Sequence, residues 1–190
     1  MTMPESTDRT QYLQTPSQTV GPFFGYALPY EGGAEVAPPW HPGTIRLHGT
    51  VLDGEGAPVP DAILEVWGAD TDGTPIARQG SLHRDGYTAT GFGRAAVDRA
   101  GHYAFTTVRP GAGAGRAPYL LVTVFARGLL HHLFTRAYLE GGDPFLATVP
   151  EGRRSTLLAT PDGDNSYRFD IRLQGEDETV FLDFVGDGRG

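Results

Sequence analysis

Short runs of alternating apolar and polar residues, separated by turn-forming residues, constrain the fold of this chain most. Ile45, Leu47 and Val51 alternate with polar neighbours, and a turn follows at residues 53–56. A period of two places these side chains on one face of a β-strand. Further strands are predicted at residues 62–67, 102–108, 119–126, 129–139, 167–173 and 179–184. Many short strands with frequent turns indicate an all-β sandwich.

The first 43 residues have a different character. They are rich in Gly, Pro and Ser, and two prolines between residues 12 and 22 disfavour both helix and central strand. Aromatic residues such as Phe23, Tyr30 and Trp40 are typical of a segment that packs on something. We therefore expect an extended N-terminal arm at residues 1–43, packed on the domain and on a partner, and a β-sandwich at residues 44–190.

One short helix is predicted near residues 149–155. Thr148 and Glu151 have the spacing of a capping box, in which Thr148 is the N-cap and Glu151 is the third helical residue.

Composition excludes several function classes. A chain of 190 residues is one domain by default. It contains no cysteine, and all 15 basic residues are arginine, so thiolate, Schiff-base and P-loop lysine chemistry are excluded. The net charge of −8 argues against a nucleic-acid partner, and an anionic ligand must be met by a local arginine. With no long apolar run and no leader-like start, the expected location is the cytoplasm.

Few side chains suggest chemistry by their spacing alone. His131 and His132 are neighbours, so in a regular strand they point to opposite faces and cannot share a metal ion. Glu65 lies in an apolar strand and is expected to pair with an arginine. Arg127 precedes a glycine at a predicted sheet rim, where it meets either a ligand carboxylate or an ordinary ion-pair partner. Spacing favours the ion pair, so the residues show no complete active site.

Three segments resemble the intradiol ring-cleaving dioxygenases. Residues 15–23 (TPSQTVGPF) resemble the family's N-terminal signature, and residues 49–67 and 98–111 resemble its middle. The middle pieces alone occur in many transthyretin-like sandwiches, but their order after the arm is specific. The C-terminal half, including residues 124–128 (VFARG) and 167–184, resembles the iron-free alpha-type chain of two-chain members.

The resemblance implies a prealbumin- or transthyretin-like sandwich and chemistry at a ferric iron held by two tyrosinates and two histidines, since hard anionic oxygen ligands stabilise Fe(III). In catalytic members a ligand tyrosine follows a Pro-Gly pair and a His-x-His follows shortly after. Here Pro110-Gly111 is followed by small residues, and the two histidine positions correspond to Tyr119 and Leu121. Tyr87 is the other tyrosine near these motifs, but its spacing departs from the family pattern. This departure is that of the alpha-type chain.

The resemblance further implies a homologous beta subunit that holds the Fe(III), with a substrate pocket at the interface of the two chains. Carried over residue by residue, the pocket walls contributed by this chain are Thr19, Gly21, Pro22, Phe23 and Arg127, and the chain has no catalytic or metal-binding residue of its own. Arg127 would attract a substrate carboxylate. The alternatives are a non-enzymatic transthyretin-like binding or structural module and a self-sufficient dioxygenase with unusual ligands.

Overall fold

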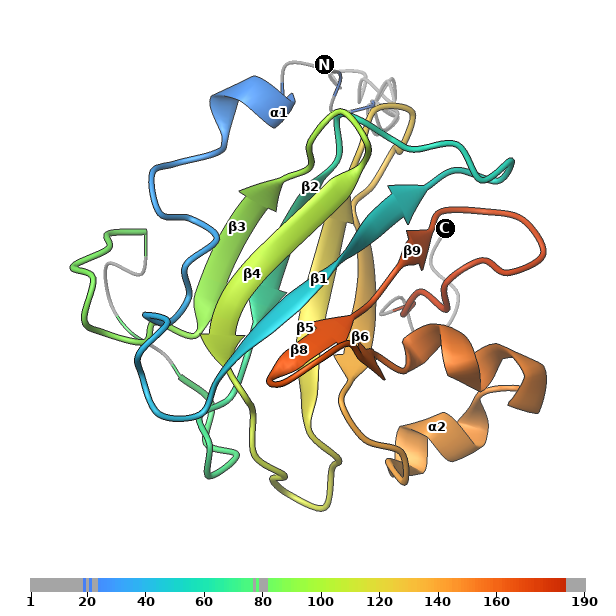
Figure 1. Cartoon of the computed structure of the whole chain (residues 1–190). Coiled ribbons are helices and arrows are strands. Elements are labelled where there is room, and N and C mark those ends of the chain that lie inside the picture. The colour runs from blue at the N-terminus through green and yellow to red at the C-terminus, as the bar shows by residue number, and fades with distance from the viewer. Residues whose placement is uncertain (1–18, 20, 22–23, 77, 79–81, 184–190) are drawn as a thin grey trace, which may run out of the picture.

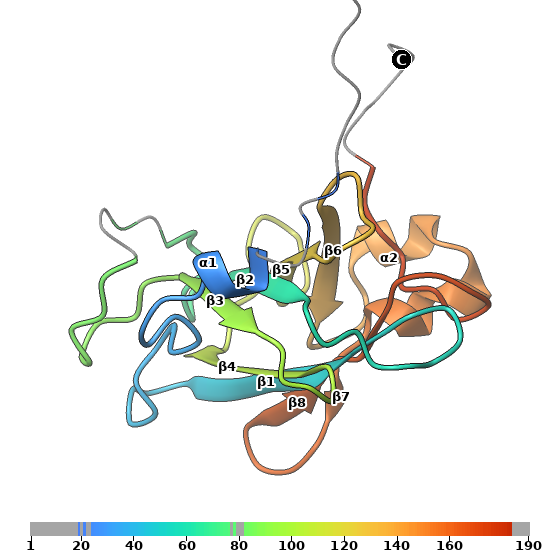
Figure 2. The same ribbon diagram turned by 90° about the horizontal axis from the view of Figure 1, so that it is seen from above.

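The computed structural model describes residues 19, 21, 24–76, 78 and 82–183 of the chain. Two β-sheets are stacked face to face, as Figures 1 and 2 show from two directions. The strands are β1 (Thr44–Leu52), β2 (Ile63–Trp67), β3 (Phe92–Ala96), β4 (His102–Val108), β5 (Tyr119–Phe125), β6 (Leu133–Tyr138), β7 (Thr160–Pro161), β8 (Ser166–Arg168) and β9 (Ile171–Arg172). The helices are α1 (Phe24–Ala27), α2 (Pro144–Thr148) and the 3-10 helix η1 (Glu151–Leu157). The predicted all-β sandwich is confirmed.

Strand order separates the two sheets. The first sheet has the order β4-β1-β8-β7, and β9 also pairs with β1. In it β1 is antiparallel to β4 but parallel to β8 and β9. The second sheet has the order β3-β2-β5-β6, with antiparallel neighbours throughout. Strand β5 is therefore an inner strand of the second sheet, and both of its ends lie at a sheet rim.

The core lies between the sheets because alternate residues of each strand point inward. Leu64 and Val66 of β2, together with Leu120, Val122 and Val124 of β5, are fully buried there. The first sheet contributes Leu47, Tyr103 and Phe105 to the same core. Burial of a Leu or Phe side chain stabilises the fold by about 1.5–3 kcal/mol, so these positions hold the two sheets together.

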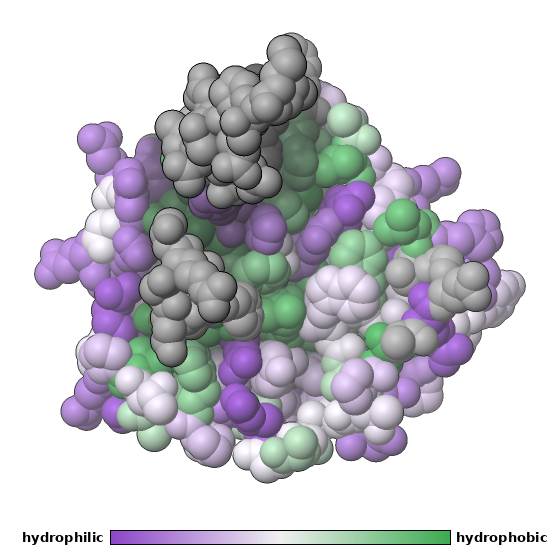
Figure 3. Space-filling view, turned by 180° about the vertical axis from the view of Figure 1, so that it is seen from behind, coloured by the Kyte–Doolittle hydropathy of each residue, from purple (hydrophilic) through white to green (hydrophobic). Residues whose placement is uncertain are grey.

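The outer face of the second sheet is less covered and carries the side chains that matter below. Glu65 and Trp67 point to this face from β2, and Tyr119 and Leu121 point to it from β5. Seen from behind, hydrophobic side chains gather across this face between polar patches (Figure 3). Glu65 Oε1 accepts hydrogen bonds from Arg94 Nε at 2.8 Å and Nη2 at 2.6 Å, which confirms the predicted pairing of Glu65 with an arginine.

Part of the predicted arm lies on the sandwich. The rings of Phe24 and Phe125 have centroids 5.0 Å apart, and Glu35 forms a β-bridge to Thr106. Val36 is buried in the core. The division into an arm at residues 1–43 and a sandwich at residues 44–190, with a partner on the arm, stays a prediction.

The predicted short helix near residues 149–155 is present as the 3-10 helix η1, but its N-terminal cap differs from the prediction. Thr148 is the last residue of α2, and its hydroxyl donates to the carbonyl of Phe145 at 2.7 Å, so it caps nothing ahead of it. Val149 is extended, as a residue before a proline prefers, and Pro150 is the N-cap of the 3-10 helix η1.

Other strand boundaries also differ from the predictions. The predicted strand at residues 129–139 begins only at Leu133, and the one at 167–173 is divided between β8 and β9. The predicted strand at 179–184 is reduced, within the described residues, to one bridge between Phe134 and Leu182. Strand β3 lies in a Gly-rich segment for which no strand was predicted. No helix formed by the described residues has the length and apolar character that crossing a membrane requires.

Candidate functional site

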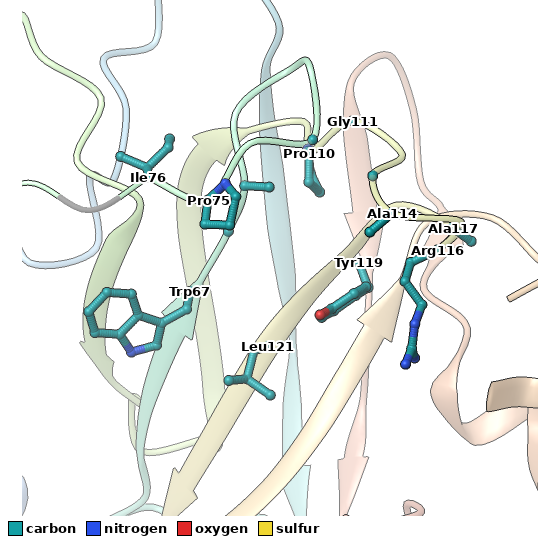
Figure 4. A pocket seen from close by; sticks show the side chains of 14 residues that line it. Trp67, Pro75, Ile76, Pro110, Gly111, Ala114, Arg116, Ala117, Tyr119 and Leu121 are labelled. Carbon is teal, nitrogen blue, oxygen red and sulfur yellow. The ribbon is translucent and has the colours of Figure 1, made fainter. Parts of the chain in front are cut away.

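A concave pocket opens at the rim where β2 ends and β5 begins. Its volume is about 360 Å³, and two loops, residues 68–76 and 110–117, form its upper wall (Figure 4). Trp67 and Tyr119 lie on opposite sides, and Leu121 lies between them at the bottom. We call this the Trp67 pocket. Its size lies within the range of small-molecule sites, about 300–1,000 Å³.

Tyr119 and Leu121 occupy the two positions that the resemblance assigns to iron-binding histidines. They are two residues apart on β5, so their side chains share one face, and both line the Trp67 pocket. Among the residues that the structure describes, the lining offers one phenol and no imidazole or carboxylate, and leucine cannot bind a metal. This donor set does not fit ferric iron. Across the described residues, no three His, Asp or Glu side chains come together as a metal site.

Arg116 provides the pocket's positive charge. It follows a tight turn in which Ala114 has φ of 50° and Gly115 has φ of 74°, and the Arg116 amide donates to the carbonyl of Gly113 at 2.9 Å. Positive φ at both central residues is the type I′ arrangement. The Arg116 side chain is half-exposed, and its Nη1 lies 3.7 Å from Asp143 Oδ1.

A second arginine packs against the Tyr119 ring on the side away from the pocket. The guanidinium of Arg136 lies 4.7 Å from the Tyr119 ring centroid and donates to the hydroxyl of Tyr138 at 3.0 Å. Burial raises the pKa of Tyr138, and Arg136 opposes this only in part. Tyr138 therefore stays a neutral phenol, and the Tyr119 ring is held between Arg136 and the open pocket.

The opposite end of β5 carries the predicted substrate-binding residues. The hydroxyl of Thr19 accepts a hydrogen bond from the amide of Gly128 at 2.8 Å and a longer one from Gly21 at 3.4 Å. The structure thus brings Thr19, Gly21 and Arg127 together at one place, which we call the Arg127 rim. A shallow hollow of about 330 Å³ lies beside Arg127.

Arg127 itself forms an ion pair. Its Nε lies 3.1 Å from Asp61 Oδ2, close enough for an ion pair. The two groups are not aligned for a hydrogen bond. The Arg127 side chain is 62% exposed and the Asp61 side chain only 13%. This is the rim ion pair that spacing alone favoured, and it leaves most of the guanidinium facing solvent.

The remaining candidates lie elsewhere. Pro22 and Phe23 are outside the described residues. His131 and His132 lie in the loop before β6 rather than in a strand, and the His132 ring packs against Phe134 with centroids 4.6 Å apart. Tyr87 is exposed and packs on Trp40 rather than lining the Trp67 pocket.

Sequence reasoning missed Trp67 and Arg116 as site residues. Trp67 was predicted only as a strand residue. Its indole lines a pocket because the loop at residues 110–117 packs beside the loop that follows Trp67. For Arg116 a local signal existed: Gly113-Ala-Gly-Arg116 is a two-residue turn flanked by a cation.

Comparison with known proteins defines first the class and then the family. In fold, the chain is similar to the dioxygenase domain of a dioxygenase–carbohydrate-binding fusion from Streptomyces sp. SirexAA-E, with a TM-score of 0.56, 21% identity and coverage of 85% of this chain and 100% of that one. The class of fold is thus a β-sandwich that this chain shares with that domain. The family model described as "Dioxygenase" matches residues 39–175.

Two curated relatives narrow this result. The chain is 41% identical to the protocatechuate 3,4-dioxygenase alpha chain of Burkholderia cepacia, over 92% of this chain and 99% of that protein. It is 31% identical to the beta chain of the same organism's enzyme, over 71% of this chain and 66% of that one. The chain belongs to the intradiol ring-cleaving dioxygenase family, a family of iron-dependent oxidoreductases.

Proposed function

We propose that this chain is the alpha subunit of a protocatechuate 3,4-dioxygenase. With a homologous beta subunit that holds the Fe(III), it forms a hetero-oligomer that cleaves protocatechuate with O2 to 3-carboxy-cis,cis-muconate. This is a cytoplasmic step of aromatic catabolism in the beta-ketoadipate pathway. The observation that carries the proposal is the 41% identity to an alpha chain over nearly the full length of both proteins.

Iron belongs to the partner in this proposal because of the donor set in the Trp67 pocket. Where the resemblance expects two histidines, the pocket has Tyr119 and Leu121. Similarity to a beta chain as well as to an alpha chain supports a partner of the same fold. When bound by the partner, the iron activates the catechol for attack by O2. The residues of this chain bind and orient the substrate around it.

Thr19, Gly21, Pro22, Phe23 and Arg127 are the residues that this chain contributes to the substrate pocket. The bond from the Gly128 amide to Thr19 supports this assignment, because it fixes the arm beside Arg127. Arg127 remains mostly exposed despite its ion pair with Asp61, so its guanidinium is accessible to a substrate carboxylate. In a chain of net charge −8, this local cation attracts the protocatechuate carboxylate.

The test is to measure iron content, visible absorption and protocatechuate-dependent O2 uptake. The chain is prepared alone and co-expressed with a candidate beta chain. The expected result is a colourless, inactive lone chain and a red-brown, active complex with one iron per alpha-beta pair. Iron, tyrosinate-to-iron absorption and turnover in the lone chain would overturn the assignment of the metal to the partner.

A further inference from the structure

Asp61, the ion-pair partner of Arg127, has surroundings that set it apart from an ordinary carboxylate at a sheet rim. We propose that Asp61 is a positioning residue, which holds Arg127 at Nε so that its two Nη groups meet the substrate carboxylate together. The inference rests on the proposed function and deepens it, because it names the group that orients the arginine in the substrate pocket.

The strand register places Asp61 opposite Arg127. Strands β2 and β5 are antiparallel, and Ile63 lies opposite Phe125 at the end of their ladder. Continuing this register by two residues puts Asp61 opposite Arg127. Directly opposed residues of an antiparallel pair have Cβ atoms about 4.5–5.5 Å apart, within reach of an ion pair. The contact therefore follows from the backbone pairing rather than from two flexible side chains that happen to meet.

The backbone that carries this pair is fixed. Ala62 and Ala126, which connect Asp61 and Arg127 to the two strands, are buried in the core. Helix α1 of the arm passes close to the same turn, since a Cβ on Gly25 would lie 3.5 Å from the Asp61 carbonyl oxygen. Core and arm thus hold the carboxylate in place, as the supporting residue of a binding group requires.

The Asp61 carboxylate is costly where it lies. Its side chain is mostly buried, and across the described residues neither of its oxygens accepts a hydrogen bond. A buried carboxylate without hydrogen bonds is destabilising, and an ion pair with an exposed arginine offsets little of that cost. Groups that break a packing rule without stabilising the fold are expected at functional sites.

The guanidinium of Arg127 is contacted at one edge. Asp61 Oδ2 lies 3.1 Å from Nε, and in the part of the chain that the structure describes neither Nη group donates a hydrogen bond. The guanidinium is planar, so a contact at Nε sets the direction of the Nη pair. That pair matches the two oxygens of a carboxylate in parallel hydrogen bonds. Contacts of this kind are often poorly aligned before substrate binds and tighten in the complex.

Simple electrostatics makes the opposite prediction, which gives the test its sign. Asp61 adds a negative charge beside the arginine that meets an anionic substrate, so on charge alone its removal strengthens the attraction. If Asp61 positions Arg127, its removal weakens the handling of the carboxylate although the site becomes more positive. A merely structural aspartate would affect substrates with and without a carboxylate equally.

The experiment measures kcat/KM for protocatechuate and for catechol in the assembled alpha-beta complex. The variants are Asp61→Asn, which keeps the shape of the side chain, Arg127→Ala and the two combined. Arg127→Lys keeps the charge but replaces the planar fork with one ammonium, which cannot hold Asp61 and the substrate as a guanidinium does. Asp170→Asn is the matched control, because Asp170 Oδ2 lies 2.9 Å from Nε of the similarly exposed Arg168 on the other sheet.

Asp61→Asn should lower kcat/KM for protocatechuate by about 5-fold, the upper range for an exposed ion pair, and leave that for catechol unchanged. Arg127→Lys should have a similar effect, and Asp170→Asn should behave as wild type. The double variant should lie within about 2-fold of Arg127→Ala alone, since the two residues act as one unit.

Four kinetic outcomes would overturn the proposal. They are a rise in kcat/KM for protocatechuate with Asp61→Asn, an equal loss for both substrates, additive losses in the double variant, or full activity of Arg127→Lys. If Asp61→Asn does not fold, the kinetics of Arg127→Lys decide the matter.

A second measurement, on the lone chain, is independent of turnover. In a chain with isotope-labelled arginine, Arg127→Lys identifies the Nε–H signal of Arg127 by its loss. The NMR order parameter of this group should lie above about 0.6 and fall below it in Asp61→Asn, as expected when a restrained group becomes mobile. The same order parameter in both proteins would overturn the proposal. Absence of turnover in the wild-type complex would instead contradict the proposed function and leave this measurement to decide the role of Asp61.

Discussion

The two ends of strand β5 each carry one arginine, and the two arginines are in opposite situations. Arg127, after the strand, contacts the mostly buried Asp61 and lies beside the arm through Thr19. Arg116, before the strand, lines the Trp67 pocket and lies 3.7 Å from the fully buried Asp143. Between them, the seven residues of β5 span roughly 23 Å. In the proposed function the Arg127 end is completed by the partner subunit, whereas the Arg116 end is formed by two loops of this chain.

The largest expected effect concerns the Arg127 end of β5. Deleting residues 1–22 removes Thr19 and its bond to Gly128, and with it the wall at the Arg127 rim. In the assembled enzyme we expect protocatechuate turnover to fall by more than about 100-fold, as loss of substrate positioning does.

Thr19→Val is the milder companion variant, since it removes one hydroxyl and keeps the arm. Oxygen-electrode rates with protocatechuate measure the effect of both variants in the assembled enzyme. Full activity in the truncated complex would remove the arm from the substrate pocket.

The next effect concerns the two aspartates beside the arginines. Asp143 is fully buried, caps α2 and accepts two backbone amides, so Asp143→Ala should lower the free energy of unfolding by about 2–3 kcal/mol. Asp61→Ala leaves only an exposed arginine without a partner and should cost about 1 kcal/mol or less. Urea unfolding of both variants tests the contrast, which equal losses would contradict.

A smaller and more selective effect is expected at the Arg127 rim. Arg127→Ala in the assembled enzyme should lower kcat/KM for protocatechuate by about 10-fold, the size of one charge-assisted contact, and change kcat/KM for catechol much less. Arg116→Ala is the control at the other end and should leave both values unchanged. An equal loss for the two substrates after Arg127→Ala would show that the arginine acts through packing or Asp61 rather than through the substrate carboxylate.

The smallest effect should spare both ends, because it comes from the other sheet. Burial lowers the pKa of His48 on β1, Arg46 and His102 act in the same direction, and Asp162, 2.8 Å from Nε2, opposes them. In the unfolded state the pKa of His48 is near 6.5, so this state binds the proton more readily than the folded one. The contribution of His48 to the free energy of unfolding is therefore largest above about pH 6.5 and declines as the pH falls below it.

His48→Gln should flatten this decline in urea unfolding between about pH 7.5 and 5.5. His83→Gln is the control, since His83 is exposed. A slope that is the same in wild type and His48→Gln would assign the pH dependence to other groups.

Sequence reasoning recovered the parts of the fold that depend on local pattern. The alternation at Ile45, Leu47 and Val51 identified β1, and the same period identified β4, whereas apolar runs bounded by turns identified β2 and β5. Strand β3 was missed because Gly91 and Gly93 are typical of a loop. Gly93 is instead a strand residue that packs directly against the Val36 side chain. Such a contact between segments distant in sequence leaves no periodic signal.

The candidate site was likewise predicted only in part. The resemblance placed Thr19, Gly21 and Arg127 at one site, and the structure brings these three together. The ion pair with Asp61 confirms the expectation from spacing that Arg127 pairs with a carboxylate. The role of Arg127 toward substrate stays a prediction. The Trp67 pocket could not be derived, because its walls come from three segments whose packing depends on tertiary structure.

The parallel pairing of β1 with β8 has a consequence for biosynthesis. Residues of β1 form ladder contacts with partners about 120 positions later in the chain. At about 5–20 residues per second, the ribosome makes β1 on the order of 10 s before the strand that covers its edge. Long-range pairings of this kind also form slowly once both strands exist. During that interval β1 presents an open edge to other nascent strands, so chaperone capture and the timing of partner synthesis will govern the yield of correctly paired chains.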